Sequence, residues 1–180
     1  MEVKYHHGNL REVLIAEGVK IIEEKGVNSL TLREIGERAG VSRTAPYRHF
    51  ADKAEFLDAI SEAGFTEFAD ALEAARDSNV KERFGVRLHA MGVAYLKFAG
   101  ERRAYYQAMF GECSRPGGPA AQRAFAVLEG MIKSGQTSGD IRPGDAAIRA
   151  KVVWALVHGI ATLRLDLDFK IVSDILRTGL

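Results

Sequence analysis

The sequence is poor in several features that would point to particular classes of protein. Its 180 residues include a single cysteine, Cys113, so an internal disulfide and a zinc site built on cysteines are excluded. No apolar run approaches the roughly 20 residues that span a bilayer. Residues 1–8 also lack the apolar stretch of a secretory signal. We therefore expect a cytoplasmic protein that does not enter a membrane.

An excess of charge of either sign is missing as well. Lys and Arg number 25 against 24 Asp and Glu, which gives a formal net charge of +1 at pH 7. Strong non-specific binding to nucleic acid needs many phosphate contacts, and a near-neutral total argues against it. Residues 26–53 nevertheless carry five basic and three acidic groups. A near-neutral total therefore hides a mildly basic segment.

Sustained alternation of apolar and polar residues, the pattern of a strand, is absent too. Helix start and stop signals divide the chain instead, and the fold prediction is all-α with about nine helices. These helices are expected over residues 10–25, 31–39, 42–49, 53–77, 81–99, 102–110, 120–134, 146–165 and 169–177. Short helices give way to long ones near Ala51, so we divide the chain into a domain of residues 1–52 and a larger one of residues 53–180.

Residues 31–50 have the pattern of a helix-turn-helix. Thr31 and Glu34 form a capping box that starts a short helix, and Gly40 permits the left-handed turn that the motif needs. Gly36 lies inside that helix, where glycine costs about 1 kcal/mol relative to alanine. We therefore expect the second helix of the motif to pass too close to Gly36 for a larger side chain.

The second short helix of this motif exposes hydrogen-bond donors and a phenol. Candidates for DNA contact are Arg43, Thr44, Tyr47, Arg48, His49 and Lys53. The two arginines can address guanine edges or phosphates, and Lys53 adds a cation at a helix N-terminus, where backbone N–H groups favour an anion. The same arginines are also compatible with a merely solvated helix face.

Residue by residue, the run TLREIGERAGVSRTAPYRHFADK (31–53) resembles the N-terminal DNA-binding domain of tetracycline-repressor-type (TetR family) transcription regulators. The resemblance covers about residues 9–60. It implies a three-helix DNA-binding domain in a homodimer. The two recognition helices of that dimer would enter successive major grooves of a palindromic operator in double-stranded DNA.

The resemblance also implies residue roles. Arg43, Thr44 and Arg48 would read bases or contact the DNA backbone. Tyr47, His49 and Lys53 would contact phosphates or position the helix, and Thr31 and Arg33 would make secondary contacts. The sequence departs from the family pattern at Ala45-Pro46, where Gly-Thr-Leu more often precedes the tyrosine. Because proline lacks an N–H and disfavours the α conformation in the residue before it, we expect this helix to start late, near Thr44.

A second resemblance concerns the C-terminal part. Trp154, His158 and Gly159 look like the Trp-His-Gly signature of one subgroup of the family, the WHG domain, and Tyr5 to Leu10 is similar to the N-terminal segment of that subgroup. His6 and His7 are then part of a tail near DNA, and no metal site is expected.

Residues 81–165 contain candidates for an effector pocket, because an apolar cavity with a few polar groups is the usual site for a small molecule. The candidates are Phe84, Leu88, Met91, Tyr95, Tyr105, Tyr106, Met109, Phe110, Phe125, Leu128, Met131, Trp154 and His158. Methionines and aromatics at helical spacing usually belong to a core, so core packing remains open for each of them. Cys113 is compatible with a redox role or with simple burial.

The last two predicted helices have broad apolar faces that fit the dimer interface implied by the resemblance. The interface candidates are Val153, Leu156, Val157, Ile160, Leu163, Phe169, Val172 and Leu176. One small subunit should not leave so much apolar surface in water.

Together these features predict a ligand-responsive repressor, which binds its operator as a dimer and is released by a small, largely apolar effector of unknown identity. No cofactor is expected. Catalysis needs a convergent acid, base or nucleophile, and no such spacing is present, so an enzyme is not expected. A helical interaction module that does not bind specific DNA is the alternative.

Overall fold

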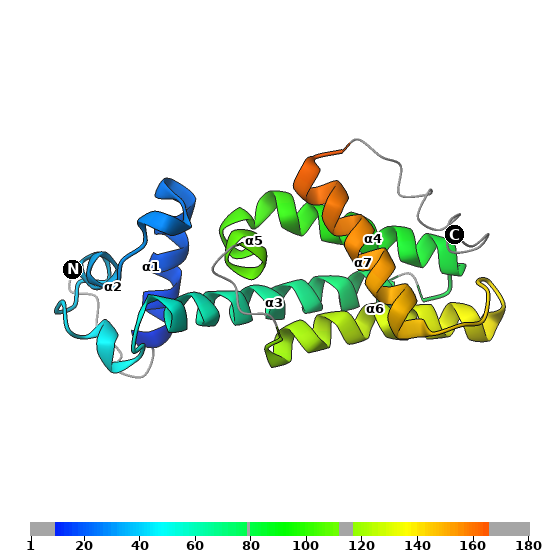
Figure 1. Ribbon diagram of the computed structural model, residues 1–180, viewed down its shortest axis with the longest axis horizontal. Helices are drawn as coiled ribbons and strands as arrows, with labels where there is room; N and C mark the ends of the chain where they lie inside the picture. The colour runs from blue at the N-terminus through cyan, green and yellow to red at the C-terminus, as the bar shows by residue number, and fades with distance from the viewer. Residues whose placement is uncertain (1–9, 79, 112–116, 166–180) are drawn as a thin grey trace. The chain divides into compact units, whose positions relative to one another are not determined.

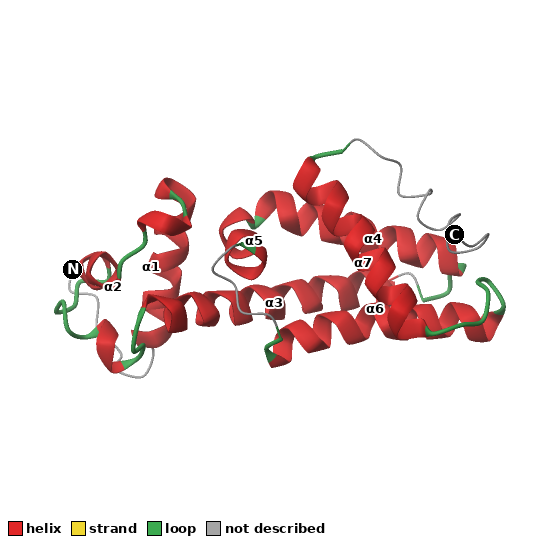
Figure 2. Cartoon of the chain, viewed as in Figure 1, coloured by secondary structure: helices red, strands yellow, loops and turns green. Residues whose placement is uncertain are grey.

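The computed structural model describes residues 10–78, 80–111 and 117–165, and within these ranges the chain is helical without strands (Figures 1 and 2). The α-helices are α1 (Leu10–Lys25), α2 (Leu32–Arg38), α3 (Lys53–Ser78), α4 (Phe84–Glu101), α5 (Arg103–Phe110), α6 (Pro119–Ser138) and α7 (Ala146–Leu163). Two 3₁₀-helices, η1 (Val27–Ser29) and η2 (Pro46–Arg48), complete the order. The all-α prediction is confirmed.

Seven of the nine predicted helices are present as α-helices. The one expected over residues 42–49 is shorter and tighter, since only Pro46–Arg48 is helical and in the 3₁₀ form. An α-helix here would need a hydrogen bond from residue 46 to the Ser42 carbonyl, and proline has no N–H to give. That carbonyl accepts instead from the Ala45 N–H at 3.0 Å, one residue earlier. The expected helix over 169–177 lies outside the described residues, as do Asn9, His6, His7 and Cys113.

The chain packs as two compact units. The described part of the first comprises residues 10–64 and 103–111, and that of the second comprises residues 65–78, 80–102 and 117–165. Helix α3 begins in the first unit and ends in the second. The division into residues 1–52 and 53–180 concerns the functions of the two parts and stays a prediction.

The first unit is built around one apolar core. Its fully buried side chains come from α1, α2, the two connecting segments and the start of α3: Leu14, Ile21, Leu30, Ile35, Phe50, Phe56 and Ile60. The Phe50 and Phe56 rings meet edge to face with centroids 4.7 Å apart. Ala104 and Ala108 of α5 belong to the same core. This core holds the helix-turn-helix in place, because its short helices are not stable alone.

The second unit consists of α4, α6, α7 and the second half of α3. Helix α7 packs against both α4 and α6. The helix ends follow local rules that the sequence displays: Asp145 accepts from the Ile148 N–H at 3.0 Å, and Pro119 is the first residue of α6. Helix α6 continues to Ser138, four residues beyond its predicted end, and stops at Gly139 with φ +80°.

Helix α7 is also, by length and composition alone, apolar enough to cross a membrane, the single such helix among the described residues. It carries Arg149 and Lys151 and packs on α4 and α6. We therefore interpret it as a helix of the second unit with one apolar face left exposed.

A close approach inside the first unit gives a stability prediction. A Cβ at Gly18 of α1 would lie 2.4 Å from Cε1 of Phe56, whose side chain is fully buried. We expect Gly18→Ala to lower the free energy of unfolding by about 1 to 3 kcal/mol, because the Phe56 ring has no space to move into.

Gly130→Ala is the control. Nothing lies within 4 Å of that position on α6, so alanine should raise the free energy of unfolding by up to about 1 kcal/mol through helix propensity. Urea unfolding followed by circular dichroism measures both; equal stability of the two variants would contradict the packing.

Candidate nucleic-acid interface

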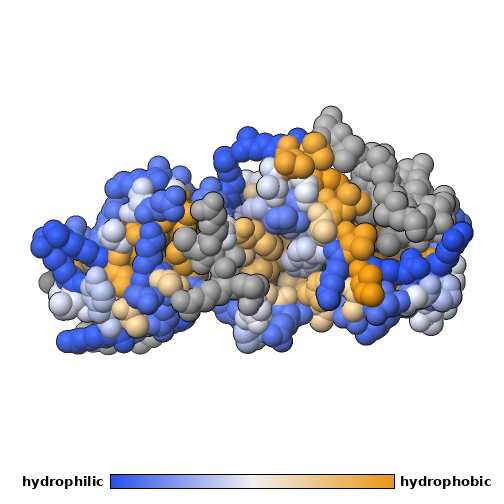
Figure 3. Space-filling model, viewed as in Figure 1, coloured by the Kyte–Doolittle hydropathy of each residue, from blue (hydrophilic) through white to orange (hydrophobic). Residues whose placement is uncertain are grey.

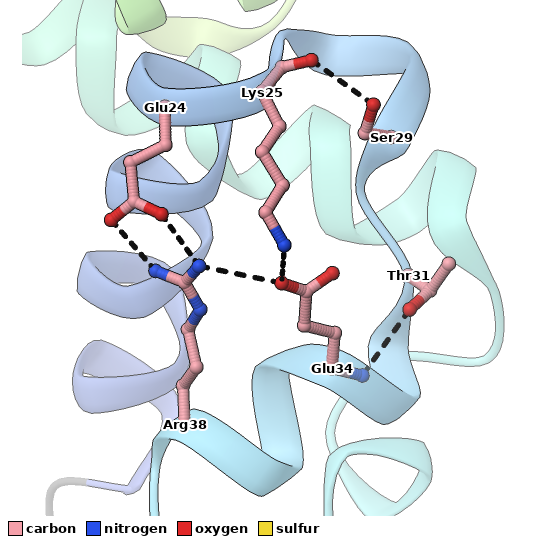
Figure 4. A network of polar contacts seen from close by, with 6 residues as sticks. All are labelled: Glu24, Lys25, Ser29, Thr31, Glu34 and Arg38. Carbon is pink, nitrogen blue, oxygen red and sulfur yellow. Dashed lines mark hydrogen bonds and ion pairs between the residues drawn. The ribbon is translucent and has the colours of Figure 1, made fainter.

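A network of charged groups fixes α2 against α1 (Figure 4). Arg38 donates from Nη1 to Oε1 of Glu24 at 2.8 Å and from Nη2 to Oε2 at 2.6 Å. Glu34 accepts from Lys25 Nζ at 2.7 Å and from Arg38 at 3.4 Å. The Arg38 hydrogen bond lowers the pKa of Glu24, and the Lys25 hydrogen bond lowers the pKa of Glu34. Both carboxylates therefore stay ionised at neutral pH and keep the two helices linked.

The turn of the helix-turn-helix has the geometry that its sequence predicts. Thr31 Oγ1 accepts from the Glu34 N–H at 3.2 Å and caps α2. Gly40 has φ +68°, which favours glycine. A Cβ at Gly36 would lie 3.0 Å from Cγ of the buried Pro46. The predicted close approach at Gly36 is confirmed, and proline is the residue that makes it.

Burial of Pro46 leaves the next three residues facing solvent. Tyr47, Arg48 and His49 are all exposed, with 55 % of the Tyr47 surface accessible. Within the described residues, neither the Tyr47 hydroxyl nor the Arg48 guanidinium has a hydrogen-bond or ion-pair partner. A phenol and a guanidinium in this position can contact phosphates or base edges without first breaking an internal bond.

The other predicted contact residues are exposed or partly exposed but have partners. Arg33 and Arg43 both approach Oε1 of Glu37, through Nε at 3.2 and 3.1 Å. Thr44 and Ser42 share a hydroxyl hydrogen bond of 3.2 Å. Lys53 donates from Nζ to the Asn28 carbonyl at 2.9 Å. Exposed ion pairs contribute about 0 to 1 kcal/mol, so DNA phosphates can displace them.

Sequence reasoning missed Glu37 and Asn28. The spacing of Arg33 and Glu37, four residues apart on one helix, was a visible signal for an ion pair. Nothing in the sequence links either residue to Arg43 or to Lys53, because those contacts exist only once the turn and η1 are folded.

A second candidate site is a small cavity inside the second unit, with a volume of about 20 Å³. Its wall is almost wholly apolar and is formed by Leu72, Leu88, Met91, Gly92, Tyr95, Leu128, Val153, Trp154 and Val157. Five predicted pocket residues are among them: Leu88, Met91, Tyr95, Leu128 and Trp154. Leu72, Gly92, Val153 and Val157 were missed as lining residues. Such a volume holds about one water molecule.

Six of the eight remaining predicted pocket residues lie elsewhere. Phe84 packs against Gly135 of α6, and Met131 is buried. In the first unit, Tyr105 and Met109 lie against Gly64. Tyr106 and Phe110, also in that unit, pair their rings at 4.8 Å. None of these six residues lines the cavity. Phe84, Met109 and Met131 are buried, and Tyr105, Tyr106 and Phe110 are partly buried, so a contact of any of them with an effector stays a prediction.

Aromatic rings and one histidine lie around the cavity. The Trp154 ring meets the rings of Phe68 and Tyr95 edge to face, at 5.7 and 5.9 Å, and Phe125 lies 6.0 Å from it. Tyr95 Oη and His158 Nδ1 share a hydrogen bond of 3.0 Å. Burial lowers the pKa of His158, so its imidazole is neutral at physiological pH.

The residues predicted for a dimer interface on α7 differ in exposure, and the interface itself stays a prediction. Val153, Val157 and Ile160 are buried by this chain's own helices, since each has at most 4 % of its surface exposed. Leu156 is partly buried and Leu163 is exposed; Phe169, Val172 and Leu176 lie outside the described residues. The large apolar side chains that α7 exposes are Ile148, Val152 and Leu163, and Figure 3 shows hydrophobic residues along this helix.

Two models of known protein families match this chain. A family model described as "Tetracyclin repressor-like, C-terminal domain" matches residues 88–178, just over half of the chain, and one described as "Bacterial regulatory proteins, tetR family" matches residues 14–60. The chain belongs to the TetR family. The helix-turn-helix described above lies within the N-terminal match, and Trp154, His158 and Gly159 lie within the C-terminal one.

TetR-family relatives with curated names match parts of the chain. The tetracycline repressor protein class A from transposon 1721 of Escherichia coli is 28 % identical over 127 residues, 71 % of this chain and 56 % of the relative. The HTH-type transcriptional repressor BepR of Brucella suis biovar 1 is 42 % identical over 67 residues, 37 % of this chain and 32 % of the repressor. The chain thus covers less than two thirds of the length of these relatives.

Solved structures resemble the chain over almost its full length. A protein of unknown function from Rhodococcus sp. RHA1 is 37 % identical, with a TM-score of 0.80 over 96 % of this chain and 94 % of the other. A tetR-family regulatory protein from Rhodococcus RHA1 has a TM-score of 0.74 at 20 % identity, over 94 % and 98 % of the two chains. At 20 % identity, the likeness to the second structure shows the shared fold alone.

Arg48, whose guanidinium has no partner among the described residues, and Lys53, which donates to the Asn28 carbonyl, are expected to affect DNA binding differently. Arg48→Ala should cost about 1 to 3 kcal/mol and relax the preference at one base, if the free guanidinium reads that base. Lys53→Ala should weaken binding to all duplexes alike and reduce the salt slope by about 1, because an ammonium near phosphate carries no sequence information. Fluorescence anisotropy on a preferred and a random duplex, at several salt concentrations, separates the two. Uniform loss for both variants would refute the role of Arg48.

Proposed function

We propose that the chain is a DNA-binding transcriptional regulator, a ligand-responsive repressor that binds a palindromic operator as a homodimer. The observation that carries this proposal is the exposure of Tyr47, Arg48 and His49 at the end of the second helix of the helix-turn-helix, with the Tyr47 hydroxyl and the Arg48 guanidinium free of partners among the described residues. Membership of a family described as bacterial regulatory proteins supports it. A regulator of DNA acts in the cytoplasm, and this role requires no catalytic group.

The dimer is proposed on the exposed face of α7. Ile148, Val152 and Leu163 have 59, 45 and 69 % of their surface exposed, and large side chains of this kind favour burial against a second copy. Two-fold symmetry would place the two readers on half-sites about 34 to 36 Å apart, one turn of the duplex.

The effector is proposed to bind at the cavity of the second unit. Its wall carries no charged side chain, and His158 beside it is neutral. A charged ligand would lose its hydration there without compensation, at a cost of several kcal/mol. We therefore propose a small, largely apolar, uncharged effector. The present volume suits one water molecule, so the cavity must widen before an effector can enter. Leu72 of α3 is part of the cavity wall, and Lys53 is the first residue of the same helix.

The DNA-binding proposal has a direct test. Duplexes carrying random cores are selected by the full chain, and the selected duplex is compared with random DNA and with the DNA beside its own gene. We expect an inverted-repeat sequence that binds about 10³-fold or more tightly than random DNA, two chains per duplex, and steep weakening with salt. Absence of any selected sequence would sink the proposal and would favour a protein-interaction module.

The effector proposal uses Trp154, the only tryptophan in the chain, which lies in the cavity wall. Neutral 2-naphthol should change its emission and weaken binding to the selected duplex, by about 5- to 150-fold if coupling is of the usual size. Its carboxylate analogue, 2-naphthoic acid, should do neither. Val157→Phe fills the cavity and should abolish the 2-naphthol effects while leaving DNA binding intact. Unchanged release from DNA in that variant would contradict this location.

A further inference from the structure

One carboxylate lies among the proposed DNA-contact residues. Glu37 is on the last turn of α2, and its Oε1 is 3.2 Å from Nε of Arg33, one turn earlier on the same helix. The same oxygen is 3.1 Å from Nε of Arg43, which follows the turn after Gly40. Two arginines from different segments therefore meet at one oxygen atom.

The three side chains are exposed, so the cluster is not a structural core. Arg33, Arg43 and Glu37 have 62, 65 and 47 % of their side-chain surface in solvent. The helix-turn-helix is held by other contacts: the network of Arg38, Glu24 and Glu34, and the packing of Pro46 on Gly36. A carboxylate on a surface that approaches phosphates raises the free energy of binding to every duplex. The carboxylate of Glu37 must therefore favour DNA binding in another way.

This favourable effect is the orientation of the Arg43 guanidinium. A guanidinium has five N–H donors in a rigid planar fork, and the shortest contact of Arg43 with Glu37 is through Nε. A guanidinium whose Nε faces a carboxylate can still direct its terminal N–H groups to O6 and N7 of a guanine. The attraction of the Glu37 carboxylate narrows the range of positions that the Arg43 side chain occupies before binding, which reduces the side-chain entropy lost on the DNA.

We infer that Glu37 is a specificity-determining residue: it positions Arg43 to read a guanine and lowers the affinity for DNA in which that guanine is absent. Arg33 shares the carboxylate and remains available to phosphate. When Arg43 lacks its base, Glu37 neutralises one of the two cations, and the surface offers one positive charge fewer to phosphates. The inference rests on the proposed DNA-binding function.

The experiment measures binding of Glu37→Gln to the duplex selected by the wild-type chain, to the same duplex with each guanine replaced in turn, and to random DNA. Affinity for random DNA should rise roughly three- to tenfold near 0.1 M salt, with the salt slope steeper by about 0.9, as expected for one more phosphate contact. At one guanine, the discrimination should fall by roughly five- to tenfold, a large part of what a bidentate contact provides. Arg43→Ala should abolish discrimination at that same guanine, and Glu37→Gln added to Arg43→Ala should change it no further.

Two variants separate positioning from charge. Glu37→Asp keeps the charge but is one methylene shorter, so it should lose discrimination at that guanine while binding random DNA like the wild type. Glu23→Gln makes the same change of charge on α1, where Glu23 is exposed and has no ion pair within the described residues, and should alter neither quantity. Thermal melting checks that each variant is folded.

The outcomes are distinct. If the wild-type chain selects no duplex, the proposed function fails. If it selects one and Glu37→Gln retains the wild-type preference at every guanine, the inference about Glu37 is wrong while the function stands. The same holds if Glu23→Gln reproduces the effects of Glu37→Gln, because general charge would then explain them.

Discussion

The proposed DNA-reading surface depends on one close contact, between the Pro46 ring and α2 at Gly36. Three residues of 3₁₀-helix are too few to hold their conformation alone. Burial of Pro46 against a position without a side chain supplies what hydrogen bonds cannot, and the chain direction at Tyr47 and Arg48 follows from it. The same proline shortens the helix by removing one N–H, so one residue both anchors this segment and limits its length. A larger residue at position 36 would displace Pro46 together with the side chains that it directs to solvent.

Features set by local rules were predictable from the sequence. Thr31 and Asp145 cap their helices, Pro119 starts α6, and a glycine inside α2 was explicable only by a close neighbour. The 3₁₀ form of η2 was not predicted: the missing N–H of Pro46 indicates a weak helix but not which carbonyl pairing replaces the lost one. The positions of Arg33 and Arg48 on the surface were expected, whereas the meeting of Arg33 and Arg43 at Glu37 depends on the folded turn.

The second unit was harder to predict for a physical reason. Helix α7 is apolar around most of its circumference, so its sequence does not show which side faces α4 and α6 and which faces outward. Val153 and Val157 proved to line this chain's own cavity, although both had been expected in a dimer interface. Methionines and aromatics likewise have the same spacing whether they line a cavity or fill a core. Tyr95 and Trp154 face the cavity, while Tyr105 and Met109 fill space beside Gly64. Only tertiary packing distinguishes these cases.

The balanced charge of the chain is compatible with specific DNA recognition once the partners of its cations are known. Of the five basic residues between positions 26 and 53, Arg33, Arg38 and Arg43 pair with carboxylates and Lys53 with a backbone carbonyl. In that described segment, Arg48 is the one cation without such a partner. A DNA-binding surface whose cations are mostly paired presents little free positive charge to random DNA. Exchanging an exposed ion pair for a contact with DNA costs about 1 kcal/mol or less. Affinity must then come from contacts that only a matching sequence can complete, and the proposed dimer would make these contacts twice. Such an arrangement favours discrimination over strength of binding.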